Sequence, residues 1–178
     1  MSGDATATPG SPHWVAAASL GEALVDAGYR IVTGGMGGVM EAACLGARRS
    51  ACYREGDTIG LLPGEDATAA NPYADVVLPT GQGHARNALV AQADALVAIG
   101  GGAGTLSEIA FAWIHRRVVI GFRLPGWSGR VADAPLDDRP RFATVSDDRV
   151  HGVDSAAEAI SILRAHLQTH LAAARPGR

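Results

Sequence analysis

The sequence predicts an α/β protein with a Rossmann-like, doubly wound parallel sheet and helices on both faces. Three observations lead to this class. Short apolar runs alternate with stretches of helical periodicity, which is the pattern of repeated strand–helix–strand units. The apolar runs are continuous, so their strands should be buried on both faces. Two glycine-rich turns each join a strand to a helix, at the edge where such sheets bind ligands.

The composition is that of a globular chain. Of its 178 residues, 47% are hydrophobic and 19% are charged, so we expect one domain over residues 1–178 with flexible ends at 1–10 and 171–178. The net charge of -3 argues against a nucleic-acid partner. No apolar run approaches the roughly 20 residues of a membrane span. The first residues lack a signal-peptide pattern, so we expect a cytoplasmic protein.

Lysine is absent, so all 15 basic residues are arginine. This excludes a Schiff-base lysine for pyridoxal phosphate and a phosphate-binding-loop lysine. Cationic roles therefore fall to arginine, or less often to histidine. We interpret Cys44 and Cys52 as free thiols rather than as a disulfide or part of a metal site.

Helices are predicted from caps and apolar spacing. The first should cover residues 12–27, because Ser11 is a suitable N-cap, Pro12 suits the first turn and Gly28 suits the C-terminal end. Apolar residues at helical spacing predict further helices, which cover residues 39–49, 84–93, 105–116 and 155–174.

Strands are predicted where short apolar runs are bounded by turn residues. These runs are residues 29–32, 58–62, 74–78, 95–99, 118–121 and 142–145. Residues 123–141 contain three prolines and are interpreted as an exposed irregular loop.

The stretch over residues 94–108 holds the candidate site, because it combines a buried strand, a glycine turn and a helix start. Such a turn exposes backbone N–H groups, lacks Cβ atoms that would block a ligand, and lies where the helix dipole favours negative charge. A phosphate is the expected guest. The candidate binding residues of this turn and of the earlier one are Gly34, Gly35, Met36, Gly37, Gly38, Gly101, Gly102, Gly104 and Thr105.

Neither turn matches the dinucleotide fingerprint G-x-G-x-x-G/A. Met40 and Ser107 stand where the last small residue is needed, and the acidic residue after the next strand is missing. A mononucleotide or a phosphorylated sugar fits better than a nicotinamide cofactor. The alternative is that the glycines form tight turns without a ligand, but two such turns at one sheet edge favour binding.

Two side chains are candidates for chemistry. Arg86 follows a predicted strand and could hold a phosphate or a carboxylate; the alternative is a solvated surface arginine. Glu108 follows Thr105 by three residues, and this spacing favours a capping box. The alternative is a carboxylate at the ligand edge that contacts ribose hydroxyls or orients a water. His84 and Asn87 either line the same edge or cap a helix.

Three segments carry a resemblance to a known family: TGGMGGVMEAA (33–43), NPYADVVLPTGQGHARNALV (71–90) and ADALVAIGGGAGTLSEIAFA (93–112). They resemble the molybdenum-cofactor carrier proteins. Those proteins belong to the lysine-decarboxylase-like set, which includes the Lonely Guy phosphoribohydrolases that release cytokinin bases from nucleoside 5′-monophosphates. The segments GHARN and AIGGGAGTLSEIA are more similar to the carriers than to the phosphoribohydrolases.

The resemblance implies roles for particular residues. In the phosphoribohydrolases an upstream arginine and the glutamate of G-G-x-G-T-x-x-E are catalytic, and by position these are Arg86 and Glu108. The carriers imply molybdenum cofactor, a pterin bearing a phosphate, as cargo. The family also implies a homo-oligomer, a dimer or a larger assembly.

The start of the chain departs from the family pattern. The family opens with an apolar strand that ends near Ser-Gly and lies centrally in the sheet. Here Met1, Ser2 and Gly3 stand where that strand should end, so we expect the first strand to be missing. An upstream start and a sheet with a gap both remain open.

Three functions are therefore compared. The first is binding of a phosphorylated, nucleotide-like ligand by a molybdenum-cofactor carrier-like protein. The second is hydrolysis of the N-glycosidic bond of a nucleoside 5′-monophosphate, with Glu108 steadying an oxocarbenium-like transition state. The third is a sensor domain for a nucleotide signal.

Overall fold

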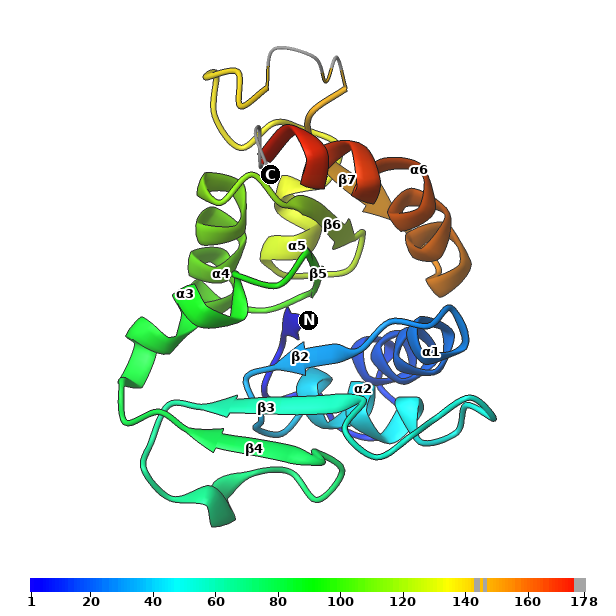
Figure 1. Cartoon of the computed structure of the whole chain (residues 1–178), viewed down its shortest axis with the longest axis vertical. Coiled ribbons are helices and arrows are strands. Elements are labelled where there is room, and N and C mark those ends of the chain that lie inside the picture. The colour runs from blue at the N-terminus through cyan, green and yellow to red at the C-terminus, as the bar shows by residue number, and fades with distance from the viewer. Residues whose placement is uncertain (143–144, 146, 175–178) are drawn as a thin grey trace.

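The computed structural model describes residues 1–142, 145 and 147–174. The strands are β1 (Ser2–Gly3), β2 (Ile31–Thr33), β3 (Thr58–Leu62), β4 (Val76–Pro79), β5 (Ala95–Ile99), β6 (Val118–Phe122) and β7 (Val150–Val153). The α-helices are α1 (Pro12–Asp26), α2 (Val39–Ala47), α3 (Asn87–Val90), α4 (Ala103–Ile114), α5 (Trp127–Val131) and α6 (Ala156–Ala174). Two 3-10 helices are η1 (Ala67–Ala69) and η2 (Gly83–Arg86). Figure 1 shows how these elements are arranged.

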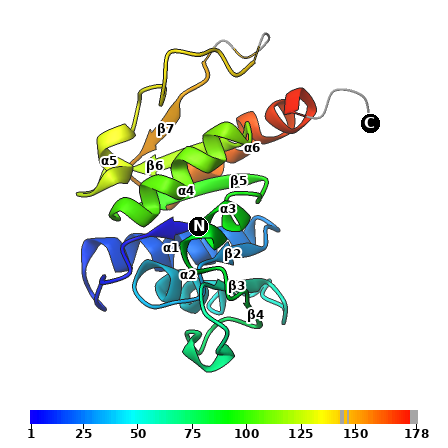
Figure 2. The same cartoon turned by 90° about the vertical axis from the view of Figure 1, so that its left-hand side faces the viewer.

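All strand pairs are parallel, as predicted, but they form two sheets. The larger sheet has the order β1-β5-β6-β7 and the smaller has the order β2-β3-β4. Figure 2 shows the larger sheet above the smaller one, with the N-terminus where the two parts meet. The doubly wound α/β class is therefore confirmed, with a break in its centre.

The break lies at the strand that we expected to be missing. Two residues of it are present, because Ser2 pairs with Ala98 and Gly3 with Ile99. Towards β2, the backbone nitrogen of Met1 donates a hydrogen bond to the Val32 carbonyl at 2.5 Å. Where the rest of a full-length strand would lie, a cavity of about 550 Å³ separates β2 from β5. The prediction of a missing strand is corrected to a strand of two residues.

The larger sheet is covered on both faces. Ile99 and Ile120 pack into a buried cluster with side chains of α1, α2 and α6, while Leu96 and Val119 pack with α4. Figure 1 shows α4 and α6 on opposite sides of β5 and β6. Continuous apolar strands produce this arrangement, because successive side chains point to opposite faces and both faces must be buried.

The smaller sheet is covered on one face. Ile31 and Leu62 are buried, and α1 and α2 pack against this side. The opposite face, which we call the bare face, consists of Val32, Ile59, Leu61, Val76 and Leu78. Its two residues on β4, Val76 and Leu78, are 39% and 48% exposed. The expectation of helices on both faces therefore holds for the larger sheet alone.

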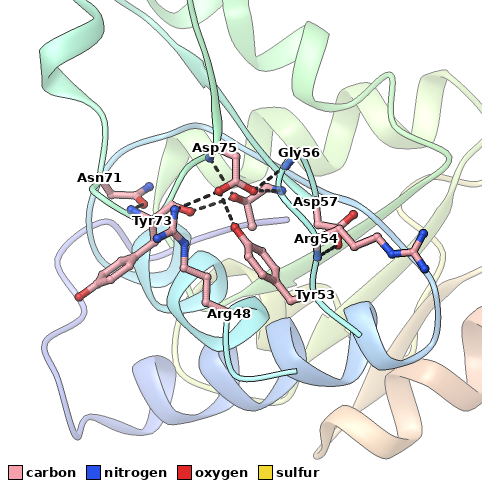
Figure 3. Close-up of polar contacts among 9 residues, drawn as sticks. Arg48, Tyr53, Arg54, Gly56, Asp57, Asn71, Tyr73 and Asp75 are labelled. Atoms are coloured by element: carbon pink, nitrogen blue, oxygen red, sulfur yellow. Dashed lines mark hydrogen bonds and ion pairs between the residues drawn. The ribbon is translucent and has the colours of Figure 1, made fainter. Parts of the chain in front are cut away.

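A buried carboxylate fastens the smaller sheet at its amino-terminal edge (Figure 3). Asp75, just before β4, accepts hydrogen bonds from Tyr53 Oη at 2.5 Å, Arg48 Nη2 at 2.9 Å and the backbone nitrogens of Gly56 and Thr58 at 3.0 and 3.3 Å. Burial raises the pKa of Asp75, but the hydrogen bonds lower it more, so its pKa lies below the usual range. These bonds join β3, β4 and the segment after α2.

Most predicted elements are present, with their ends shifted by at most two residues. Residues 123–141, expected to be an irregular loop, contain the helix α5. Residues 84–93 form η2 followed by the four-residue α3 rather than one helix. The strand β7 was not predicted. The strand expected over 142–145 includes residues 143 and 144, which lie outside the described residues.

Residues 1–10, expected to be a flexible end, begin with the buried Met1 and Ser2, while residues 171–174 continue α6. Cys44 is buried and Cys52 is exposed, both as free thiols. Within the described residues, none of the helices is long and apolar enough to cross a membrane.

Candidate functional site

The second glycine turn opens the candidate site. Gly100 and Gly101 have positive φ angles of 62° and 84°, which glycine adopts without steric cost. Gly102 is the N-cap of α4 and provides no side-chain capping bond. A Cβ on Gly102 would meet nothing within 4 Å, and one on Gly104 would meet only Asn87, at 3.9 Å. The start of α4 is therefore open to an anion.

The helix α5 clamps this turn. Trp127 and Ser128 donate backbone hydrogen bonds to the carbonyls of Gly101 and Gly100, at 3.0 and 3.1 Å. The buried hydroxyl of Ser128 accepts from the Gly100 nitrogen at 2.6 Å and donates to the Phe122 carbonyl at 2.8 Å. This contact was not predicted, because residues 127–131 lie in a segment whose prolines and glycines indicate an irregular loop.

The first glycine turn is more closely packed. A Cβ on Gly35 would lie 2.9 Å from Leu62 Cδ2, and one on Gly38 would lie 2.3 Å from the Asp4 carbonyl oxygen. Asn71 Nδ2 donates to the carbonyls of Gly35 and Met36 at 3.1 and 3.2 Å. Packing therefore explains Gly35 and Gly38, whereas Gly37 has only distant neighbours. Ligand binding at this turn stays a prediction.

Arg86 lies between the first glycine turn and α4. A Cβ on Gly34 would lie only 2.5 Å from Arg86 Nη1, so glycine makes room for the guanidinium. Arg86 is 6% exposed, which excludes the interpretation as a solvated surface arginine. Its Nη1 lies 3.6 Å from Glu108 Oε1, and its Nε is buried without a hydrogen-bond partner in the structure. An unpaired buried donor is costly.

Glu108 does not cap α4. The helix begins at Ala103, and Thr105 Oγ1 donates to the Gly3 carbonyl at 3.2 Å. The Glu108 side chain instead reaches Ser2, whose hydroxyl donates to Glu108 Oε2. Spacing alone had favoured a capping box, and tertiary contacts overrule it. Burial raises the pKa of Glu108 above its usual range, although Ser2, the amino group of Met1 and Arg86 each lower it.

The other predicted residues divide into two groups. Asn87 is buried and its Nδ2 donates to Ser107 Oγ at 2.8 Å, so it fixes α3 against the start of α4. His84 is exposed and does not belong to the buried group. Ser2 was missed as a site residue, although the Ser-Gly signal at the start of the chain had marked its position.

The assembled edge combines an open helix start, one buried guanidinium and one buried carboxylate. The first two attract an anion such as a phosphate. The carboxylate beside them has a pKa above its usual range because it is buried, and such perturbed groups are typical of sites that transfer protons. The arrangement supports anion binding and is compatible with acid–base chemistry.

This geometry can be compared with known proteins. The model of the SLOG cluster4 family matches residues 2–160, a span that contains both glycine turns, Arg86 and Glu108. The chain belongs to the SLOG cluster4 family.

Solved structures agree with this SLOG assignment. A structural genomics target named TM1055 has a TM-score of 0.76 at 32% identity, with 92% of this chain and 94% of that chain covered. The molybdenum cofactor binding protein of Rippkaea orientalis has a TM-score of 0.73 at 30% identity, with 92% of both chains covered. The molybdenum cofactor carrier protein of Chlamydomonas reinhardtii has a TM-score of 0.71 at 27% identity, covering 94% and 95%.

Proposed function

We propose that this protein binds a phosphorylated, nucleotide-like small molecule at its strand-to-helix turns and acts as a carrier for molybdenum cofactor. The observation that carries the proposal is Arg86, a buried guanidinium that lies 3.6 Å from Glu108 of α4 and whose Nε has no hydrogen-bond partner among the described residues. Two structural neighbours are described as molybdenum cofactor binding or carrier proteins. The phosphate would lie at Gly102 and Gly104, and we propose the cytoplasm as the location.

The decisive experiment identifies the ligand directly. Protein purified from cells that make the cofactor is denatured, and the released fraction is assayed for pterin by fluorescence and for molybdenum by mass spectrometry. We expect both from the parent and a loss of at least tenfold from Arg86→Gln. Arg30→Gln is the matched control, because its side chain is 75% exposed. Parent protein that releases neither pterin nor molybdenum would contradict the carrier function.

Hydrolysis of nucleoside 5′-monophosphates is the second candidate, favoured by the raised pKa of the buried Glu108. In this reaction water adds to the ribose C1′, the N-glycosidic bond breaks, and the base leaves with a proton. Glu108 would engage the ribose or the attacking water, and Arg86 would hold the phosphate. A panel of nucleoside 5′-monophosphates is incubated with the parent, Glu108→Ala and the exposed control Glu55→Gln. Free base from the parent and control, but not from Glu108→Ala, would establish the enzyme.

The bare face supports a further part of the proposal, a homo-oligomer. Its five side chains are all apolar, and β3 and β4 contain no charged residue. Exposed apolar sheet faces are typical of protein interfaces, and a stable interface covers about 800 Å² on each partner. We expect an assembly in light scattering that Leu78→Arg disrupts, whereas Val15→Arg, on α1, leaves it intact. A monomeric parent would contradict this part.

A further inference from the structure

The first two residues of the larger sheet reach the candidate site. Ser2 is 1% exposed and lies in β1 beside β5, where Figure 1 marks the N-terminus. Its hydroxyl donates a hydrogen bond to Glu108 Oε2. The second carboxylate oxygen, Oε1, faces Arg86 Nη1 at 3.6 Å. The carboxylate therefore lies between one hydroxyl donor and one guanidinium.

The two contacts of Glu108 differ in closeness. A direct bond between a guanidinium and a carboxylate is about 2.8 Å long, so the Arg86 contact at 3.6 Å is loose. The Ser2 contact is a direct hydrogen bond. The hydroxyl thus draws the carboxylate towards β1, and no close ion pair with Glu108 occupies the Arg86 guanidinium.

Glu108 also opposes ligand binding when it is ionised. A carboxylate beside Arg86 neutralises part of the charge that an anion needs, and it repels the anion itself. The charged or titratable groups around Glu108 are Arg86 from η2 and the amino group of Met1 from β1, with Cys44 of α2 acting on that amino group. Of the contacts that favour the ionised form, the hydrogen bond from Ser2 has the largest effect.

We propose that Ser2 is a positioning residue that fixes the direction and the charge of the Glu108 carboxylate, and so sets the anion affinity of Arg86. The proposal rests on the proposed function, because it assumes that the guanidinium binds a phosphate. Ser2 touches no ligand in this scheme. It acts through Glu108, and its influence should disappear when Glu108 carries no charge.

The test is the pH dependence of adenosine 5′-monophosphate binding, measured by calorimetry between pH 5 and 9. The probe titrates identically with every variant, so differences between the curves report on the protein. In the parent, affinity should fall as Glu108 ionises. Ser2→Ala removes a hydrogen bond to the ionised form, so its midpoint should move upward by about one pH unit. Ser2→Thr keeps the hydroxyl and should restore the parent midpoint.

A double variant separates positioning from folding. Glu108→Gln should remove the dependence of affinity on pH that Glu108 causes. Adding Ser2→Ala to Glu108→Gln should then leave the affinity curve unchanged. The proposal is overturned if the Ser2→Ala curve coincides with that of the parent, or if Ser2→Ala still shifts the curve when Glu108 is Gln. Carbon NMR titration of labelled glutamate in the parent and in Ser2→Ala measures the same pKa shift without ligand. If the parent does not bind adenosine 5′-monophosphate, the assumed binding of a nucleotide phosphate at Arg86 fails, while this titration still decides whether Ser2 sets the charge of Glu108.

Discussion

The two sheets are held together in different ways. The larger sheet is buried between helices on both faces, and its central strands pack into two apolar clusters. The smaller sheet has helices on one face, a bare face on the other, and the Asp75 cluster at its edge. Where apolar cover is incomplete, a polar network supplies the connections between strands.

This difference places the candidate site. The glycine turn, α4 and the Ser2 contact belong to the larger, doubly covered sheet. The smaller sheet contributes Gly34, after β2, and positions Arg86 through β4 and η2. Arg86 and Glu108 thus come from opposite sides of the break. The distance between them therefore depends on how firmly the two sheets are joined.

The largest effect should come from the core of the larger sheet. Ile120→Ala removes a fully buried side chain from β6 and should lower the free energy of unfolding by about 4 kcal/mol, because a cavity remains. Ile59→Ala on the bare face should cost about 1 kcal/mol. Urea denaturation of both variants measures the two losses of unfolding free energy. Equal losses would show that the bare face is covered in solution.

A smaller effect is expected at the Asp75 cluster. Asp75→Asn removes the charge that Arg48 faces and turns an acceptor into a donor opposite existing donors. We expect a loss of about 2–3 kcal/mol in the free energy of unfolding. Asp66→Asn, at an exposed loop position, is the matched control and should cost far less. Indistinguishable losses at the two positions would mean that the network contributes little to the smaller sheet.

The break itself can be tested by filling it. Four apolar, β-branched residues placed before Met1 would extend β1 into the cavity of about 550 Å³ between β2 and β5. Burial of their side chains, less the cost of ordering them, should add about 1–2 kcal/mol and raise the melting temperature by about 3–6 °C. Four glycine–serine residues provide the control. An unchanged melting temperature with the apolar extension would contradict the idea that the break lacks a strand.

The smallest effect is a pH dependence in the larger sheet. His151 on β7 is buried, and burial followed by the charge of His166 lowers its pKa to about 4. The unfolded chain takes up this proton near pH 6.5, whereas the folded chain does so near pH 4. Stability should therefore fall as the pH drops from about 6.5 towards 4, by about 0.8 kcal/mol at pH 6.

Urea denaturation at pH 8 and pH 6 measures this loss. His151→Leu removes the titrating group and should reduce the difference between the two pH values. The buried His170, whose pKa is also lowered, would leave a residual dependence. An undiminished difference in the variant would assign the acid sensitivity to other groups.

The sequence predicted those elements that local signals define. Strands 58–62 and 95–99 were placed with their observed bounds, because apolar runs end at clear turn residues. β7 was missed because His151 and Gly152 interrupt its apolar run, and pairing with β6 creates the strand. α5 was missed because five residues with an internal glycine carry little helical signal.

The site was predictable in outline. Sequence motifs predict Arg86 and Glu108 as site residues, and the structure places Arg86 Nη1 3.6 Å from Glu108 Oε1. Their roles toward a ligand stay predictions. The pattern T-x-x-E favours a local capping bond from Glu108 to its own helix. In the fold, Glu108 instead accepts a hydrogen bond from Ser2, which lies 106 residues away in the sequence. Contacts across such separations leave no local signal in a single sequence.

The clamp on Gly100 and Gly101 has a kinetic consequence. Hydrogen bonds from Trp127 and Ser128 already fix these residues, so an arriving anion has little backbone to order. Association should then be fast, and differences in affinity between ligands should appear mainly in their dissociation rates. A five-residue helix behind the turn would in this way lengthen the residence time of a ligand without touching it.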